Sequence, residues 1–380
     1  MLKIKSRYII KQIFENISEK KNLQIINYNK QLQKLLDISI KDYKEYNQIE
    51  IELIPIAHHK KEDKFINRLN KDKSFIHIYI NNNKRKEFNC CRLENKTKIS
   101  KIRIVIDNEI KSLKGLFKNC ECLEEINIIK CKRKDINDTS EMLYGCKNLN
   151  KLNIFNLKTD KVTDMSYMFS ECSSLKILEL SIFNTSNVTN MQNMFEKCSN
   201  LTQLNLNNLN TSNVIYMNDM FSECSSLNSI NIDNFNTSNV INMSYMFYNC
   251  SSLEKLNITN FDTSKVRDMS YIFNNCRKIE DLNLSSFKTS NVINMSNMFN
   301  RCSSLINLTI PNFDIKKSTR IKCMFSKCKL IKQSTIQFQF KNISINDAFE
   351  EDKKKYDDDF IFFEDFYDLN DEPPLNFLFH

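Results

Sequence analysis

Cysteine is the residue whose spacing in this sequence could most readily support chemistry. Thiolates form disulfides, ligate zinc and act as nucleophiles. Two close pairs, Cys120 with Cys122 and Cys90 with Cys91, are weak signals, because no Cys-x-x-Cys pair or nearby histidine gives zinc spacing. Nine of the 14 cysteines instead recur 26 residues apart, at Cys120, Cys146, Cys172, Cys198, Cys224, Cys250, Cys276, Cys302 and Cys328.

A cysteine that recurs at an apolar position is most simply a small buried hydrophobe, so we expect a column of reduced thiols in the core. Disulfides or metal binding form the alternative, since coils stacked about 4.8 Å apart could bring thiols within bridging distance.

No other set of residues predicts catalysis. His58 and His59 fall in a lysine-rich loop, for which solvation is the default. Gly115 and Gly145 are the only glycines, which excludes a glycine-rich phosphate loop. No Ser-His-acid set can be assigned to one site. We therefore predict a chain that is not an enzyme and has no catalytic, metal-binding or cofactor-binding residues.

The 26-residue period predicts a solenoid of about nine coils. In one coil, Val188, Met191, Phe195 and Cys198 have the spacing of one face of a short helix. Asn190 precedes them and could cap that helix through its side-chain oxygen.

The second half of each coil predicts a strand. Leu201, Leu204 and Leu206 follow a Leu-x-x-Leu-x-Leu pattern whose last two members alternate as in a strand. A polar Thr-Ser-Asn corner recurs at 185–187, and its side chains can satisfy a turn. Because glycine is so rare here, asparagine is expected to occupy the left-handed conformation at that corner. The fold class is therefore α/β, with a short helix and a parallel strand in each coil.

The repeated unit N-T-S-N-V-x-x-M-x-x-M-F-x-x-C-S-x-L-x-x-L-x-L-x-x-F resembles the BspA-like leucine-rich repeat, in its Mycoplasma-type variant. The match covers roughly Ile102 to Phe338. The resemblance implies a leucine-rich-repeat solenoid with a parallel strand ladder on one face. It also implies binding, adhesion or scaffolding rather than catalysis.

Four segments are expected along the chain. Residues 1–45 carry three apolar clusters of helical type, residues 46–99 form a β-rich N-terminal region or cap, residues 100–340 form the solenoid, and residues 341–380 form an acidic aromatic tail. Residues 1–45 also resemble an F-box, which would bind a Skp-type adaptor, although the usual Leu-Pro opening and tryptophan are absent. The alternative is a plain helical cap. The tail could solubilise the chain, cap the last coil or bind a partner.

Charge is uneven along the sequence. Residues 1–100 hold 22 Lys and Arg against 12 Asp and Glu, a net +10, and residues 341–380 hold 4 against 12, a net −8. A nucleic-acid interface on the basic segment lacks any supporting motif, so a solvated surface is preferred and no nucleic-acid partner is expected. The N-terminus lacks the apolar core of a signal peptide, and no run of residues is apolar enough for a membrane span. These features favour a cytoplasmic location, with the nucleus as an alternative.

The outward strand positions are the expected partner-binding surface, since many weak polar contacts suit protein recognition. A generic solvated face is the alternative. Phe155, Ile177 and Ile182 are the large apolar candidates on or near the strands. The predicted binding residues are Lys151, Asn153, Phe155, Glu179, Gln203, Asn205, Asn231, Lys255, Asn257, Asp281 and Asn283.

The sequence thus favours a non-catalytic protein-interaction module or scaffold. Two alternatives are a substrate-recognition subunit of an F-box-type ubiquitin ligase and a surface adhesin.

Overall fold

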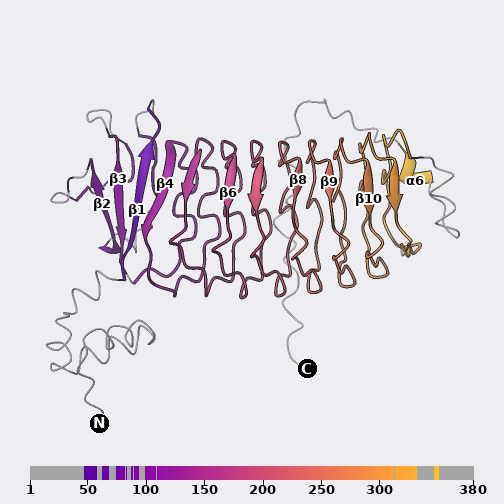
Figure 1. The fold of residues 1–380 in the computed structure, drawn as a ribbon, viewed down its shortest axis with the longest axis horizontal. Coiled ribbons are helices and arrows are strands. Elements are labelled where there is room, and N and C mark those ends of the chain that lie inside the picture. The colour runs from indigo at the N-terminus through magenta and orange to yellow at the C-terminus, as the bar shows by residue number, and fades with distance from the viewer. Residues whose placement is uncertain are drawn as a thin grey trace, which may run out of the picture.

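The computed structural model describes residues 47–57, 62–67, 74–81, 83, 87–88, 90–93, 99–107, 109–311, 313–331 and 346–350. Stacked coils form one long row, with a five-stranded sheet at the N-terminal end and a short helix at the other (Figure 1). The elements are β1 Ile49–Pro55, β2 Ile76–Ile80, β3 Ile102–Ile106, β4 Leu123–Lys130, β5 Lys151–Asn153, β6 Ile177–Glu179, β7 Gln203–Asn205, β8 Ser229–Ile230, β9 Lys255–Leu256, β10 Asp281–Asn283, β11 Asn307–Thr309 and α6 Asn346–Phe349.

The N-terminal sheet covers the first coil and is continuous with the solenoid. Its strand order is β2-β3-β1-β4-β5. β1 alternates buried and half-buried residues, as its period-two sequence predicts, and pairs antiparallel with both β3 and β4. β4 also pairs in parallel with β5. β4 therefore joins the antiparallel region to the repeat ladder without leaving an open sheet edge between them.

The parallel strands repeat in a register of 26 residues, which confirms the solenoid prediction. Ile177 pairs with Gln203, and Asp281 pairs with Asn307. A second parallel ladder runs through single bridges, such as those joining Asn190 to Tyr216 and then to Asn242. The strands pair as β4 with β5, β6 with β7, β8 with β9 and β10 with β11, whereas the ladder of single bridges runs without a break from Ser112 to Arg320.

The predicted short helix is wrong for the described coils, where that segment is a run of tight turns. In the coil from Met191 to Cys198, the N–H of Met194 bonds to the carbonyl of Met191, and that of Cys198 bonds to Phe195. The alternate N–H groups, on Asn193 and Phe195 among others, donate to carbonyls of the following coil at 3.0 Å. Asn190 does accept from the N–H of Gln192, at 3.1 Å, so it caps a turn instead of a helix.

Two residues in each turn segment occupy the left-handed region. Asn193 has φ 54° and Lys197 has φ 56°, and the equivalent positions of the other described coils are also positive. Asn187, at the Thr-Ser-Asn corner, is not among the positive-φ residues, so the expectation for that corner was wrong. Both glycines, Gly115 and Gly145, occupy such positions in the first coils. A left-handed residue every fourth position interrupts any α-helix.

The core consists of columns of identical side chains. Phe221, Phe247 and Phe273 are fully buried and stack with ring centroids 5.5 and 5.8 Å apart. The cysteine column is buried and its thiols are free, as expected. The Cys224 thiol donates to the carbonyl of Phe195 in the preceding coil at 3.1 Å.

The Thr-Ser-Asn corner is held by a buried threonine column. Thr211 donates its hydroxyl hydrogen to the carbonyl of Asn236 at 2.9 Å and accepts from the N–H of Asn236 at 2.7 Å. Thr185 makes the same two bonds to Asn210. These side chains satisfy the corner between coils rather than only locally.

α6 covers the last described coil. The N–H of Phe325 donates to the carbonyl of Ala348 at 2.7 Å, and Ala348 is buried. Residues 1–45, His58 and His59, and all of the predicted tail 341–380 except residues 346–350 lie outside the described residues. The F-box-like, histidine-loop and tail predictions therefore stay predictions. None of the helices that the structure describes has the length and apolar character to cross a bilayer.

Candidate protein-interaction face

The outward side chains of β5 to β11 form one surface, which we call the strand face. Leu178 and Leu282 point into the core, and the residues on either side of them point outward. Of the eleven predicted binding residues, ten are exposed and Asn205 is half-buried. The structure therefore brings all of them onto one side of the coils, as the period-two pattern predicts.

The asparagine column of this face also has a structural role. Asn153 accepts from the N–H of Phe155 at 3.2 Å, and Asn257 accepts from the N–H of Thr259 at 3.3 Å. Asn205, Asn231 and Asn283 cap the same turn in their coils, each accepting from the N–H two residues ahead. Their side-chain oxygens are thus already engaged, and the uniformity of this column reflects turn formation.

The neighbouring column varies more from coil to coil. It contains Lys151, Ile177, Gln203, Lys255 and Asp281, all exposed. Lys151 lies 3.8 Å from Glu125 of the preceding coil, and Asp281 accepts from the side-chain amide of Asn307. Exposed ion pairs of this kind contribute little stability. The side chains of this column are exposed and vary from coil to coil, so this column can contribute to the recognition of a specific partner.

An apolar patch lies where the strands of the first coils end. We define it as Ile129, Phe155 and Ile182, with exposed fractions of 43%, 53% and 37%. Ile129 and Phe155 are equivalent residues of successive coils, and Ile182 follows Ser181, the next equivalent. Ile177, 55% exposed at the start of β6, lies on the same face with Glu179 between it and the turn. Sequence analysis missed Ile129, although one step of 26 residues back from Phe155 would have found it.

Ile182 also lacks a hydrogen bond that the asparagines at the equivalent positions of other coils make. The side-chain amides of Asn156 and Asn208, one coil before and one coil after, donate to carbonyls of their preceding coils at 2.7 to 2.9 Å. Asn234 and Asn260 do the same further along. The isoleucine side chain cannot donate a hydrogen bond. This coil therefore lacks the side-chain bond to the preceding coil and has an exposed apolar side chain at that position.

Charge distinguishes the two ends of the strand side. The strand-and-turn segments 121–132, 147–158 and 173–184 hold six lysines against four acids, a net +2. The equivalent segments 199–210, 225–236, 251–262, 277–288 and 303–314 hold four bases against six acids, a net −2. The apolar patch therefore lies at the basic end.

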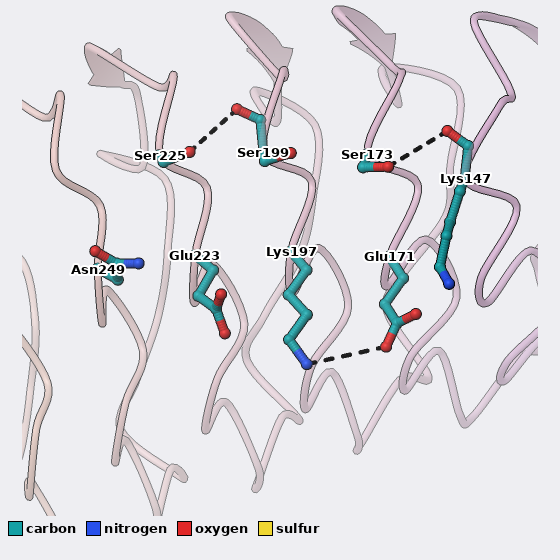
Figure 2. Close-up of a pocket in the computed structure, with 8 residues that line it drawn as sticks. All are labelled: Lys147, Glu171, Ser173, Lys197, Ser199, Glu223, Ser225 and Asn249. Atoms are coloured by element: carbon teal, nitrogen blue, oxygen red, sulfur yellow. Dashed lines mark hydrogen bonds and ion pairs between the residues drawn. The ribbon is translucent and has the colours of Figure 1, made fainter. Parts of the chain in front are cut away.

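A second candidate is an open groove beside the turn segments. Figure 2 shows its alternating column of Lys147, Glu171, Lys197 and Glu223 beside a row of serines. Lys197 lies 3.9 Å from Glu171 and 3.4 Å from Glu196. Burial opposes protonation of Lys197, but the surrounding carboxylates raise its pKa overall.

The serine row of the groove is also engaged. Ser173 donates to the carbonyl of Lys147, and Ser225 donates to that of Ser199, both at 3.3 Å. The groove thus consists of contacts that join one coil to the next. We interpret it as structural.

The N-terminal sheet carries a third polar cluster. Glu50 pairs with Arg103 at 2.6 Å and with Lys130 at 3.5 Å. His77 lies between Glu87 and Asp107, at 3.3 and 3.2 Å. Burial works against the charged imidazole, but these two carboxylates raise the pKa of His77. The pairing joins neighbouring strands. No group of three His, Cys, Asp or Glu side chains suited to a metal ion occurs among the described residues.

Comparison with solved structures finds a leucine-rich repeat protein from Bacteroides ovatus, at 19% identity and a TM-score of 0.31, with 59% of this chain and 69% of that chain covered. A search of curated protein sequences finds no match.

A family model matches three tandem segments, residues 111–203, 174–257 and 251–360. Together they span more than half of the chain, and they coincide with the parallel ladders described above. This agrees with the resemblance to Mycoplasma-type repeats. The chain belongs to the DUF285 family, described as Mycoplasma protein of unknown function.

Proposed function

We propose that the chain is a non-catalytic protein-interaction module that binds a partner through the basic end of its strand face, with the apolar patch at the centre. The observation that carries this proposal is the clustering of Ile129, Phe155 and Ile182 where equivalent positions in later coils are polar or Pro311. Exposed apolar side chains rimmed by charge are typical of protein-binding surfaces.

Of the predicted binding residues, those near the patch gain most support. Phe155 is part of the patch, and Lys151 and Glu179 lie on the same coils, with Ile177 beside them. Gln203, Lys255 and Asp281 lie further along the strand face and would extend the contact to a long partner. The capping asparagines would contact a partner only through their side-chain NH2 groups, because their side-chain oxygens already accept turn hydrogen bonds.

A photoreactive amino acid at residue 155 tests the proposal in cells that express the chain. A partner crosslinked there would be purified, and its affinity measured calorimetrically. The double variant Phe155→Ser with Ile182→Asn should bind at least tenfold more weakly, because truncating apolar anchors costs most in an interface. The matched control is Ile293→Ser, which removes an exposed isoleucine outside the strand face. Equal losses in both variants would argue against the patch.

The adhesin and F-box alternatives assign the same array to different contexts. An adhesin would place the crosslinked partner outside the cell that makes the chain. An F-box receptor would bind a Skp-type adaptor through residues 1–45, and deleting those residues would abolish adaptor binding while leaving the strand-face partner bound.

A further inference from the structure

The segment 356–372 has an unusual composition that neither the fold nor the proposed function uses. It holds eight acidic residues and no basic residue, with Tyr356, Tyr367 and four phenylalanines among them. An acidic segment rich in aromatic side chains can bind a surface that is both apolar and basic.

The end of the array does not need these aromatics. The last phenylalanine of the core column, Phe325, stacks against Phe349 of α6 at 5.2 Å. The N–H of Cys323 donates to the carbonyl of Asp347 at 2.8 Å. Residues 346–349 therefore occupy the position where a further coil would lie.

The apolar patch has the complementary character. Ile129, Phe155 and Ile182 offer exposed apolar surface, and exposed Lys151 and Lys176 lie on the same coils. The net +2 of these strand-and-turn segments contrasts with the −2 further along, so a segment of charge −8 is drawn to this end.

The chain is long enough to reach. α6 lies at the opposite end of the array from β4 and β5 (Figure 1). Residue 182 precedes residue 350 by roughly six coils, or about 30 Å at about 4.8 Å per coil. The chain from residue 350 to 364 can span up to about 45 Å at about 3.3 Å per residue. Attachment to the same molecule raises the local concentration of the segment to the millimolar range typical of tethered ligands, about 1 mM.

We propose that residues 356–372 bind the apolar patch of their own chain and cover it until a partner displaces them. This inference rests on the proposed function, because it assigns regulation to the same patch. The aromatic side chains would contact Phe155 and Ile182, and the acidic residues would face Lys151 and Lys176.

The test compares the full chain with a chain that ends at residue 355 and retains α6. A fluorescent peptide of residues 356–372 is titrated into each, and its anisotropy is followed. The peptide should bind the shortened chain at least tenfold more tightly than the full chain, whose patch is covered. Binding should weaken from 50 to 500 mM salt. Equal binding to both chains would overturn the proposal.

Two matched variants of the shortened chain locate the binding site. Phe155→Ser with Ile182→Asn should lose peptide binding at least tenfold, while Ile293→Ser should retain it. A peptide with its four phenylalanines replaced by serine keeps its charge and should also fail to bind. If that peptide binds as well as the original, the contact is only electrostatic and the proposed docking is wrong.

Two further measurements are needed. One distinguishes docking within one chain from exchange of the segment between two chains, and the other distinguishes failure of this proposal from failure of the proposed function. The full chain should elute as a monomer at every concentration tested, because a concentration-dependent dimer would show exchange of the segment between copies. If the patch variants lose the partner but no chain binds the peptide, the proposed function stands and the covering segment does not. If the peptide binds the patch and the partner ignores the patch variants, the proposed function fails instead.

Discussion

Phe325 and Phe349 stack with ring centroids 5.2 Å apart and an interplanar angle of 25°. Only 24 residues separate them, whereas the other neighbours in this column are 26 apart. α6 therefore continues the column with a shorter connection and shields a ring that would otherwise meet water.

Replacing Phe349 by alanine should destabilise the last coils locally. The lost ring contact and burial should cost about 1–3 kcal/mol, because Phe349 is only partly buried. Hydrogen exchange of the amides around Phe325 should accelerate, while amides around Phe195 keep their protection. Uniform acceleration along the array would show that α6 does not act as a local cap.

Phe247→Ala should be far more costly. Phe247 is fully buried between Phe221 and Phe273, and its truncation leaves a cavity, so we expect a loss of about 3–5 kcal/mol in the free energy of unfolding. Urea denaturation followed by circular dichroism measures it. Phe155→Ala is the control and should change stability by less than about 0.5 kcal/mol, since its ring is exposed. A marginal effect at Phe247 would contradict the packing of the column.

The threonine corner can be tested with an isosteric change. Thr211→Val keeps the shape but leaves the N–H and carbonyl of Asn236 without the hydroxyl, so a loss of about 2–3 kcal/mol is expected. Thr202→Val is the matched control, because the Thr202 hydroxyl is exposed and water can replace it. Similar losses for the two variants would show that the buried position is not special.

Asp219 should make stability depend on pH. Its burial raises the pKa of the carboxyl from 3.8 to about 7, with the Glu196 and Glu223 carboxylates adding to the shift and the Asn218 amide opposing it. A raised acid pKa means that the folded state binds the proton more tightly. The contribution of Asp219 therefore becomes unfavourable as pH rises from about 4 to about 7 and stays constant above that.

Asp219→Asn should flatten that dependence. Asparagine occupies the equivalent position at Asn193 and Asn297, so the variant restores a residue that this site accommodates. At pH 8 it should be more stable by about 1–2 kcal/mol, less than the full shift implies because the carboxyl keeps partial solvent access. At pH 4 the two proteins should be closely similar. Glu223, whose pKa burial also raises, leaves a residual slope.

The cysteine column should resist modification. Burial raises the pKa of Cys198 and Cys250 to about 12, and that of Cys224 also well above its ordinary value. At pH 8 an aromatic disulfide reagent should therefore modify the half-buried Cys90 and Cys91 first and reach the column only after denaturant is added. Rapid labelling of Cys224 in the native protein would contradict its position.

The sequence predicted the architecture well because the repeat is periodic. The spacing of the cysteines gave the register later seen between Ile177 and Gln203, and alternation around Leu178 placed the strand face. The turn segment was harder to predict. Met191, Phe195 and Cys198 have the spacing of a helix, but the N–H groups between them bond to residues 25 positions away. Local periodicity carries no information about such distant partners.

The candidate site was predicted in part for a similar reason. Phe155 and Ile182 stand out in the sequence because most other coils have polar residues at the equivalent positions. Their meaning depends on the amide of Asn208, whose bond to Ser181 shows what Ile182 has given up, and that bond joins different coils. The structural role of Asn153 and Asn257 as turn caps likewise required the backbone geometry.

The ladder of parallel bridges between the coils has a genetic consequence. Each described bridge between coils joins a residue to the one 26 positions later. Duplication or loss of one whole period in the coding sequence would therefore bring together two surfaces that already match. Such an event would change the length of the array and the distance between the patch and α6. In the remaining coils each residue would still pair with the equivalent residue of the neighbouring coil. A gene of this kind can vary in length by recombination between its own repeats, and selection can then act on length separately from the composition of the binding surface.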